Sequence, residues 1–188
     1  MVRRDATRPD AVDGILAQWK RELPEMNASA LEVFGRLHRV FMRYQTHLNE
    51  TFSRHGINAA AFDILAALRR HGAPYRLTAG ALADTSLITT GGISLRIDRL
   101  EKSGLVVRER DEDDRRVVYV QLTDDGRHLV EAVAADHFAA EDALLVALTA
   151  TERRQLGQLL SRLERSLDVV EATTRTNDAR SETSGGLG

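Results

Sequence analysis

Arginine side chains carry the clearest chemistry in this sequence, because they gather in the segment from Leu77 to Thr123. The guanidinium group presents a planar fork of donors that matches phosphate oxygens and the edges of bases. The formal net charge of the chain is −2, so any contact with a nucleic acid must come from a local basic cluster and not from bulk charge. The arginines of this segment are Arg96, Arg99, Arg108, Arg110, Arg115 and Arg116.

Other chemistries lack the residues that they require. The chain contains no cysteine, which excludes disulfides, thiolate zinc sites and thiol redox sensing. Its histidines are not paired at the spacing of helical metal ligands, since His38 and His47, like His128 and His137, lie about two and a half helical turns apart. No nucleophile elbow, phosphate loop or dinucleotide fingerprint occurs. We therefore expect no enzymatic activity, no metal and no cofactor.

The segment that must position the arginines begins with two predicted helices. Thr78 begins a short helix that ends at Asp84, and after a turn a second helix runs from about Ile88 to Ser103. Apolar residues of the second helix recur at i, i+4 and i+7, so one stripe of it faces a core. The residues of this stripe are Ile93, Ile97 and Leu100.

A hairpin follows these helices. Residues 105–108 and 117–122 are rich in β-branched side chains and predict two strands, joined by a charged tip at 109–116. Helix, turn, helix and an arginine-tipped hairpin make up the plan of a winged helix-turn-helix, whose second helix enters the major groove while the hairpin reaches the minor groove. The alternative is a small α/β domain with a charged hairpin that binds nothing.

Long helices are expected on both sides of this segment. Apolar residues step by three and four along residues 29–55, and again after Thr149, which forms a capping box with Glu152. A winged domain cannot bury such stripes, so we expect them to pack on one another and on a second copy of the chain. A helix bundle within one chain is the alternative. A twofold dimer would present its recognition helices to half-sites about 34–36 Å apart.

The composition, with 43% hydrophobic and 29% charged residues, predicts a globular protein of the mainly α (α+β) class, a winged helix-turn-helix with long N- and C-terminal dimerisation helices. No apolar run approaches the length of a membrane span or a signal peptide, so we expect a cytoplasmic protein with no membrane contact. The predicted regions are a disordered N-terminus at 1–9, N-terminal helices at 10–56 (an added helix at 10–23 and a dimerisation helix at 29–55), a DNA-binding domain at 57–122, C-terminal dimerisation helices at 123–172 and a flexible tail at 173–188.

The segments RIDRLEKSGLV and LTDDG and the Asp114-Arg115-Arg116 wing resemble the MarR (multiple antibiotic resistance regulator) family of bacterial transcription factors. The resemblance implies a homodimeric winged-helix repressor that binds double-stranded DNA and loses affinity when a small molecule binds. It implies that Arg116, with Arg115, enters the minor groove while Asp114 holds the wing arginine. The residues that it assigns to the major groove and the phosphates are Thr89, Thr90, Ser94 and Arg99.

A narrower resemblance is to the urate-responsive branch of this family. That branch has a tryptophan in an additional N-terminal helix, an aspartate and an arginine seven apart on the helix before the winged segment, and an arginine in the recognition helix. The matching residues are Trp19, Asp63, Arg70 and Arg96. The resemblance implies a ligand such as urate or a related purine. Residues seven apart share one helix face at a separation of about 10.5 Å, which agrees with a joint role for Asp63 and Arg70.

The mechanism that we expect is a charge exchange. An anionic purine held by Arg70 and Trp19 would repel Asp63 and loosen its pairing with Arg96, which would release the recognition helix. Each residue also has a simpler interpretation, with Trp19 as a core anchor, Asp63 and Arg70 as surface charges, and Arg96 as a phosphate contact. The alternative effector is a phenolic or antibiotic-like aromatic compound. The alternative function is a structural winged module that does not read DNA sequence.

Overall fold

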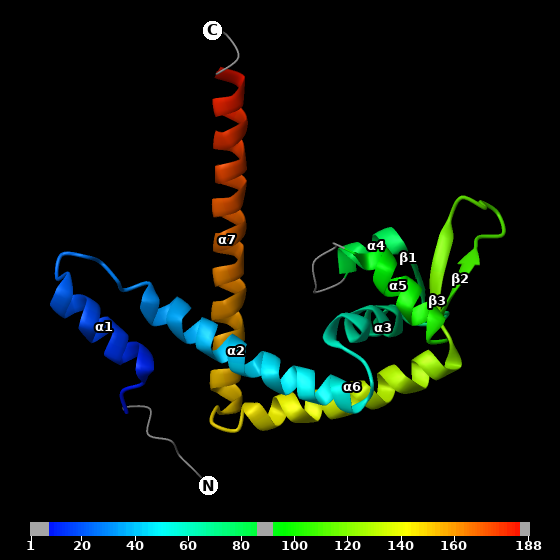
Figure 1. Ribbon diagram of the computed structural model, residues 1–188, viewed down its shortest axis with the longest axis horizontal. Helices are drawn as coiled ribbons and strands as arrows, with labels where there is room; N and C mark the ends of the chain where they lie inside the picture. The colour runs from blue at the N-terminus through cyan, green and yellow to red at the C-terminus, as the bar shows by residue number, and fades with distance from the viewer. Residues whose placement is uncertain (1–7, 86–91, 185–188) are drawn as a thin grey trace. The chain divides into compact units, whose positions relative to one another are not determined.

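The computed structural model describes residues 8–85 and 92–184, with side chains up to Thr173. Its contacts divide the described residues into two compact units, one made of residues 8–142 and the other of residues 143–184. The described residues are mostly helical, with one small antiparallel sheet, so the predicted mainly α class with a winged helix-turn-helix is confirmed (Figure 1). None of the helices in the described ranges is long and apolar enough to cross a membrane.

Helix α1 (Ala11–Glu22) begins at a complete capping box. Asp10 Oδ1 accepts from the backbone N–H of Val12 at 2.7 Å, and Asp13 Oδ2 accepts from the N–H of Asp10 at 2.7 Å. The helix is fixed to α2 (Leu31–Arg54) by Val12, which is 1% exposed and lies against Gly35. Arg36 adds ion pairs to Asp10 at 2.9 Å and to Asp13 at 2.6 Å. The added N-terminal helix is therefore attached to the first part of α2.

Helix α2 begins at Leu31, two residues after the start of the predicted range 29–55. Ala30 occupies its N-cap position without a side-chain hydrogen bond, while the N–H of Ser29 donates to Asn27. At its other end Phe52 is 2% exposed and stacks on Phe62 of α3 (Ala59–His71), with ring centroids 4.8 Å apart. This contact joins α2 to the winged domain.

The winged domain consists of α3, β1 (Arg76–Thr78), α4 (Ala79–Thr85), α5 (Ile93–Lys102), β2 (Val106–Arg110) and β3 (Val118–Leu122), with strand order β1-β3-β2. The wing pairs Val106 with Leu122 and Arg110 with Val118. One buried cluster joins these elements to α6 (Asp124–Leu144). The residues of this cluster are Ile64, Leu65, Ala66, Ala67, Leu68, Leu77, Leu82, Ile97, Leu100, Val106, Val120, Leu122 and Val130.

The start of α6 lies against the backbone that leads into the wing. Thr123 Oγ1 accepts from the N–H of Gly126 at 3.0 Å and donates to the carbonyl of Gly104 at 2.7 Å. A Cβ at Gly126 would lie 2.0 Å from the carbonyl oxygen of Leu105, so only glycine allows this approach. Helix α6 starts directly after Thr123 and ends at Leu144.

The second unit is dominated by α7 (Ala150–Ser184), which begins at the predicted capping box. Glu152 Oε2 accepts from the N–H of Thr149 at 2.7 Å, and Thr149 Oγ1 accepts from the N–H of Glu152 at 3.3 Å. The helix continues through residues 173–184, which lie in the range where the sequence predicts a flexible tail. Residues 173–184 contain neither glycine nor proline, the residues that most often end a helix.

Candidate functional site

Helix α5 presents the side chains expected of a recognition helix. Its apolar stripe is buried against the core, since Ile97 is 1% exposed and Leu100 is 4% exposed. Ser94, Leu95 and Arg99 are exposed on the other sides of the helix. The helix starts at Ile93, after Gly92 with a φ of 80°, and the predicted contacts Thr89 and Thr90 lie outside the described residues.

The tip of the wing is shaped by two aspartates. Asp111 Oδ1 accepts from the backbone N–H groups of Asp113 at 3.0 Å and Asp114 at 2.9 Å. These two hydrogen bonds, first that of Asp114 and then that of Asp113, hold the pKa of the Asp111 carboxyl below its usual value. At the base of the tip, the guanidinium carbon of Arg76 lies 4.5 Å above the ring of Tyr119. The wing therefore has a defined shape before any DNA is bound.

Asp114 holds the wing arginine that the family resemblance singles out. Its Oδ1 accepts from Arg116 Nε at 3.1 Å, its Oδ2 from Arg116 Nη2 at 3.2 Å, and its Oδ1 also from the Arg116 N–H at 3.0 Å. The side-chain hydrogen bonds from Arg116 hold the pKa of the Asp114 carboxyl below its usual value. The Arg116 side chain is nevertheless 91% exposed, and Arg115 beside it is exposed as well.

Arg108 has a role that the sequence analysis missed. It was grouped with the arginines available to a nucleic acid, but its guanidinium pairs with Asp98 and Glu101 of α5. Its backbone N–H also donates to Glu101 Oε1 at 3.2 Å. The hydrogen bonds to Asp98 and to Glu101 raise the pKa of Arg108 above its ordinary value. No local signal marks this pairing, because it joins a helix to a strand.

Three of the four predicted effector residues lie in the winged domain. Asp63 is 7% exposed on α3, whose final residues include exposed Arg70. Arg70 Nη2 lies 3.5 Å from the carbonyl of Thr85 at the end of α4. Arg96 is half-buried on α5, which packs against α3. The structure thus assembles this part of the predicted set on neighbouring helices.

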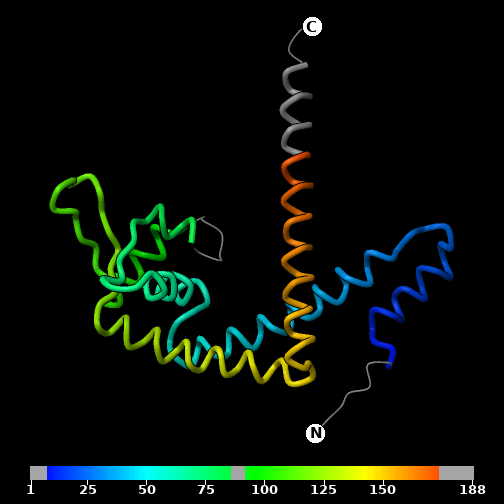
Figure 2. The backbone as a smooth tube through the Cα atoms, turned by 180° about the vertical axis from the view of Figure 1, so that it is seen from behind, coloured from blue at the N-terminus to red at the C-terminus, as the bar shows by residue number. Residues whose placement is uncertain are grey.

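The fourth predicted effector residue, Trp19, is not brought to the others. It lies on α1 with 42% of its surface exposed. Figures 1 and 2 show, from opposite sides, α1 beside one end of α2 and α3 at the other end. The pairing of Val12 with Gly35 fixes α1 near the start of α2, and about 25 Å of helix separate Gly35 from Phe52. One chain does not place Trp19 next to Asp63.

A hollow of about 700 Å³ lies beside the recognition helix. Apolar side chains from the turn between α2 and α3, from α5 and from α6 line it, among them Ile57, Leu100 and Leu129. Arg96 and Arg99 also line it, so the hollow combines an apolar wall with two cationic groups. Such a lining suits a small aromatic anion.

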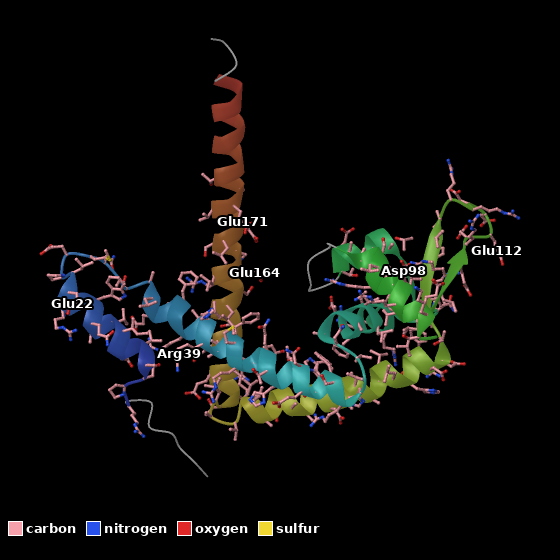
Figure 3. All side chains as sticks on the ribbon, in the orientation of Figure 1. Glu22, Arg39, Asp98, Glu112, Glu164 and Glu171 are labelled. Atoms are coloured by element: carbon pink, nitrogen blue, oxygen red, sulfur yellow. The ribbon has the colours of Figure 1, made fainter. Side chains whose placement is uncertain are left out.

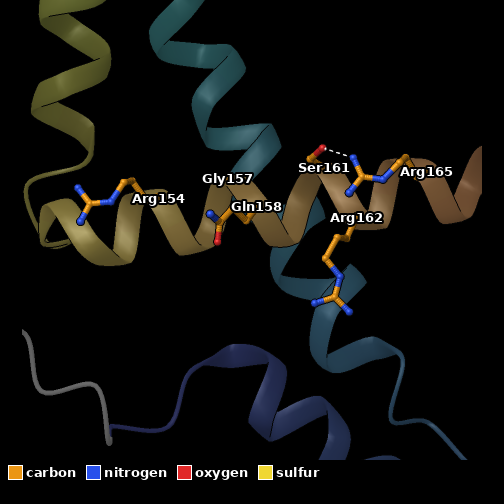
Figure 4. Close-up of a pocket in the computed structure, with 6 residues that line it drawn as sticks. All are labelled: Arg154, Gly157, Gln158, Ser161, Arg162 and Arg165. Carbon is orange, nitrogen blue, oxygen red and sulfur yellow. Dashed lines mark hydrogen bonds between the residues drawn. The ribbon is translucent and has the colours of Figure 1, made fainter.

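A second hollow, of about 600 Å³, lies on α7 in the other unit (Figure 4). It surrounds Gly157 and is bordered by arginines, of which Arg165 donates to Ser161 Oγ at 2.7 Å. None of the predicted effector residues lines it. Within the described parts of the chain, no group of three or more metal-binding side chains was found.

The sequence and the fold are similar to those of known regulators. Residues 55–117 match the family model described as MarR family. The transcriptional regulator PecS of Dickeya dadantii (strain 3937) is 36% identical over 156 residues, which cover 83% of this chain and 94% of PecS. The solved structure of Bordetella bronchiseptica BpsR, described as regulated in its DNA binding by 6-hydroxynicotinic acid, is 28% identical with a TM-score of 0.63 and covers 70% of this chain and 92% of its own.

A third similar structure contains DNA. Sco3205 of Streptomyces coelicolor, solved in complex with DNA, is 26% identical with a TM-score of 0.67 and covers 76% of this chain and 89% of its own. The named relatives are transcriptional regulators and not enzymes.

Proposed function

From the premise that this chain belongs to the MarR family of DNA-binding transcriptional regulators, we propose that it is a repressor that binds a pseudo-palindromic operator as a homodimer and is released by a small anionic aromatic ligand. The observation that carries the proposal is the combination of α5 with a wing whose exposed Arg116 is already aligned by Asp114. A rigid wing loses little conformational entropy on binding DNA. The protein acts in the cytoplasm, where its DNA is.

In this proposal α5 lies in the major groove. Ser94 and Arg99, with Thr89 and Thr90 before the helix, contact base edges and phosphates. Arg116 and its neighbour Arg115 enter the minor groove, where an arginine is attracted by the concentrated negative potential. Two copies of this surface read half-sites about 34–36 Å apart.

The homodimer is supported by apolar side chains that one chain leaves in water. Along α2, Val33 is 52% exposed, Phe34 46%, Val40 64% and Phe41 50%. In the other unit, helix α7 carries a further series of exposed apolar side chains: Leu156, Leu159, Leu160, Leu167, Val169 and Val170. Contiguous apolar surface of this kind marks an interface in a water-soluble protein, and a second copy has matching stripes.

The effector is proposed to be urate or a related purine. Arg70 supplies a cation for the anionic ring. Buried Asp63 lies on the same helix, seven residues before Arg70, with the small residues Ala66 and Ala67 between them. Anion binding next to Asp63 raises the energy of a second negative charge and so disturbs the packing of α3 against α5. A coupling of about 1–3 kcal/mol between ligand and DNA is enough for a 5–150-fold loss of DNA affinity.

Trp19 completes this site from the partner subunit. Because α1 is held at the far end of α2 from α3, its exposed ring contacts a purine only if it reaches across the dimer. Complementation tests this directly. Chains carrying Trp19→Ala and chains carrying Arg70→Ala each form dimers that fail to respond to urate, whereas a mixed dimer regains one intact site. A mixed dimer that stays unresponsive places Trp19 and Arg70 in the same site of one chain, or outside the site.

A second effector class is favoured by the hollow beside α5. Its apolar wall with Arg96 and Arg99 suits a phenolic or aromatic acid, and BpsR, a similar protein, is described as regulated by such an acid. Tryptophan fluorescence separates the two classes, since Trp19 is the only tryptophan. Quenching by urate that disappears in Arg70→Ala supports the purine, whereas release of DNA by 6-hydroxynicotinic acid without quenching supports the hollow.

DNA binding is tested with a labelled duplex from the intergenic region upstream of the gene. We expect a specific complex at nanomolar protein that random duplex fails to displace until it is in about 10³-fold excess. Millimolar urate, xanthine or hypoxanthine should dissociate the protein–DNA complex. If random duplex competes as well as the specific duplex does, the protein is instead a structural winged module. Arg116→Ala should weaken binding and lower the salt slope by about 0.9, while Arg21→Ala, an exposed arginine on α1, serves as the matched control.

A further inference from the structure

The recognition helix carries two carboxylates in a position that opposes DNA binding. Asp98, which Figure 3 labels, follows Ser94 by four residues and Leu95 by three, so helical spacing puts it on the side of α5 that carries these two exposed residues. Its side chain is 48% exposed, and that of Glu101 is 38% exposed. Carboxylates near phosphate groups repel them, and the repulsion acts on every DNA sequence alike.

We propose that Arg108 neutralises Asp98 and Glu101, so that α5 presents a net cationic surface to DNA. The inference rests on α5 being the DNA-reading helix of the proposed function. Arg108 is thereby removed from the arginines that contact the nucleic acid.

The register of the sheet directs Arg108 toward α5. Arg108 pairs with Val120 across the wing, and side chains of paired residues lie on the same face of a sheet. Val120 is 1% exposed, and Val106, two residues before Arg108, is 0% exposed. Arg108 therefore extends from the face that covers the core, one step beyond the apolar contacts, where it meets the acidic side of α5.

The Arg108 guanidinium contacts both carboxylates at once. Nη2 donates to Asp98 Oδ1 and Nη1 donates to Glu101 Oε2, so both terminal nitrogens have a carboxylate partner. The Arg108 backbone N–H donates to the other oxygen of Glu101 at 3.2 Å, which fixes that carboxylate from a second direction. A lysine has one charged nitrogen and cannot form this fork.

The test uses protein variants and a duplex of random sequence at low salt, because the charge effect does not depend on an operator. Arg108→Met keeps most of the side-chain length and removes the charge. We expect it to weaken DNA binding about tenfold, which corresponds to about 1.4 kcal/mol. We expect the triple change Arg108→Met, Asp98→Asn and Glu101→Gln to restore the affinity to within about threefold of the parent protein. The carboxylates that Arg108 neutralises are then absent, so the loss of Arg108 no longer leaves them unpaired.

Arg110→Met is the matched control, because it removes an exposed arginine from the same strand. Its loss of affinity should not be reversed by Asp98→Asn and Glu101→Gln. A triple variant that binds as weakly as Arg108→Met overturns the proposal and makes Arg108 a phosphate contact. If the parent protein fails to bind any duplex, the proposed function fails instead.

A further variant covers the case in which Arg108→Met does not fold. Asp98→Asn with Glu101→Gln, in the presence of Arg108, should bind DNA as tightly as the parent or more tightly, because two negative charges are lost and Arg108 is freed. Circular dichroism confirms that this variant is folded. A loss of tenfold or more in its affinity would mean that the carboxylates themselves contact bases, and would refute their role as neutralised charges.

Discussion

Replacing Gly126 by alanine should destabilise the protein through one backbone contact. In most helices the change stabilises, because alanine loses less conformational entropy than glycine on folding. Here the new Cβ would lie 2.0 Å from the carbonyl oxygen of Leu105 and 2.9 Å from its carbonyl carbon. Real contacts of a Cβ are essentially never below 3.0 Å, so the backbone must shift by about 1 Å.

The size of the effect follows from what that shift disturbs. Leu105 accepts a hydrogen bond from the N–H of Thr123 at 3.2 Å, and its own N–H donates to Leu100 at 3.0 Å. It is followed by Val106, which is fully buried. Overpacking against a rigid backbone costs about 3 kcal/mol, which for a chain of this length lowers Tm by about 6–12 °C. Because Leu105 leads into the wing, DNA binding should weaken in the same variant.

The assay is thermal unfolding followed by circular dichroism, with Gly14→Ala as the control. Gly14 lies inside α1, and a Cβ there would meet nothing within 4 Å. We expect Gly14→Ala to keep or raise Tm by a few degrees, in line with a gain of about 0.5–1 kcal/mol. If Gly126→Ala melts as the parent protein does, the close approach of α6 to Leu105 is not a constraint and the reasoning is wrong.

Three further outcomes follow from named contacts. Asp114→Ala should weaken DNA binding. Arg116 lowers the pKa of the Asp114 carboxyl, so the ion pair is fully formed above the ordinary pKa of an aspartate and is lost only as pH falls through the lowered pKa. This pair should therefore cause no change in DNA affinity between about pH 5 and 8. Arg36→Met should make α1 more sensitive to limited proteolysis than α3, since its ion pairs to α1 are removed. Tyr44 should remain protonated at pH 10, where ordinary tyrosines are about half ionised, because burial and then the hydrogen bond to Glu141 raise its pKa; absorbance titration against Tyr44→Phe measures this.

Elements with a local signal were predictable from the sequence. The capping box at Thr149 and Glu152 depends on residues three apart, and both hydrogen bonds are present. The inner stripe of α5 depends on helical spacing alone, and Ile97 and Leu100 are buried. The strand β1 was missed because three residues cannot show a period, and only pairing with β3 makes Arg76–Thr78 a strand.

Contacts between segments that lie far apart in the sequence could not be predicted from it in the same way. Asp63 and Arg70 were placed on one helix by their spacing, which the structure reproduces, but nothing local determines where α1 carries Trp19. That position depends on Val12 against Gly35 and on Arg36 with two acids, contacts that join residues more than twenty positions apart. Sequence patterns therefore predicted the parts of the candidate effector site and not their assembly.

The arginines of the winged segment show why residue counts misjudge a DNA-binding surface. In the sequence Arg108 and Arg116 both belong to the group of arginines in the winged segment. In the structure Arg116 is paired with one aspartate and is still 91% exposed, whereas the Arg108 side chain is 31% exposed between two carboxylates. A cation that neutralises acids of its own recognition helix favours DNA binding, as does a cation that faces the phosphates, because removing a repulsion and adding an attraction have the same sign. The chain can thus keep a net charge of −2 and still bind a polyanion, provided that its acids near the DNA are paired.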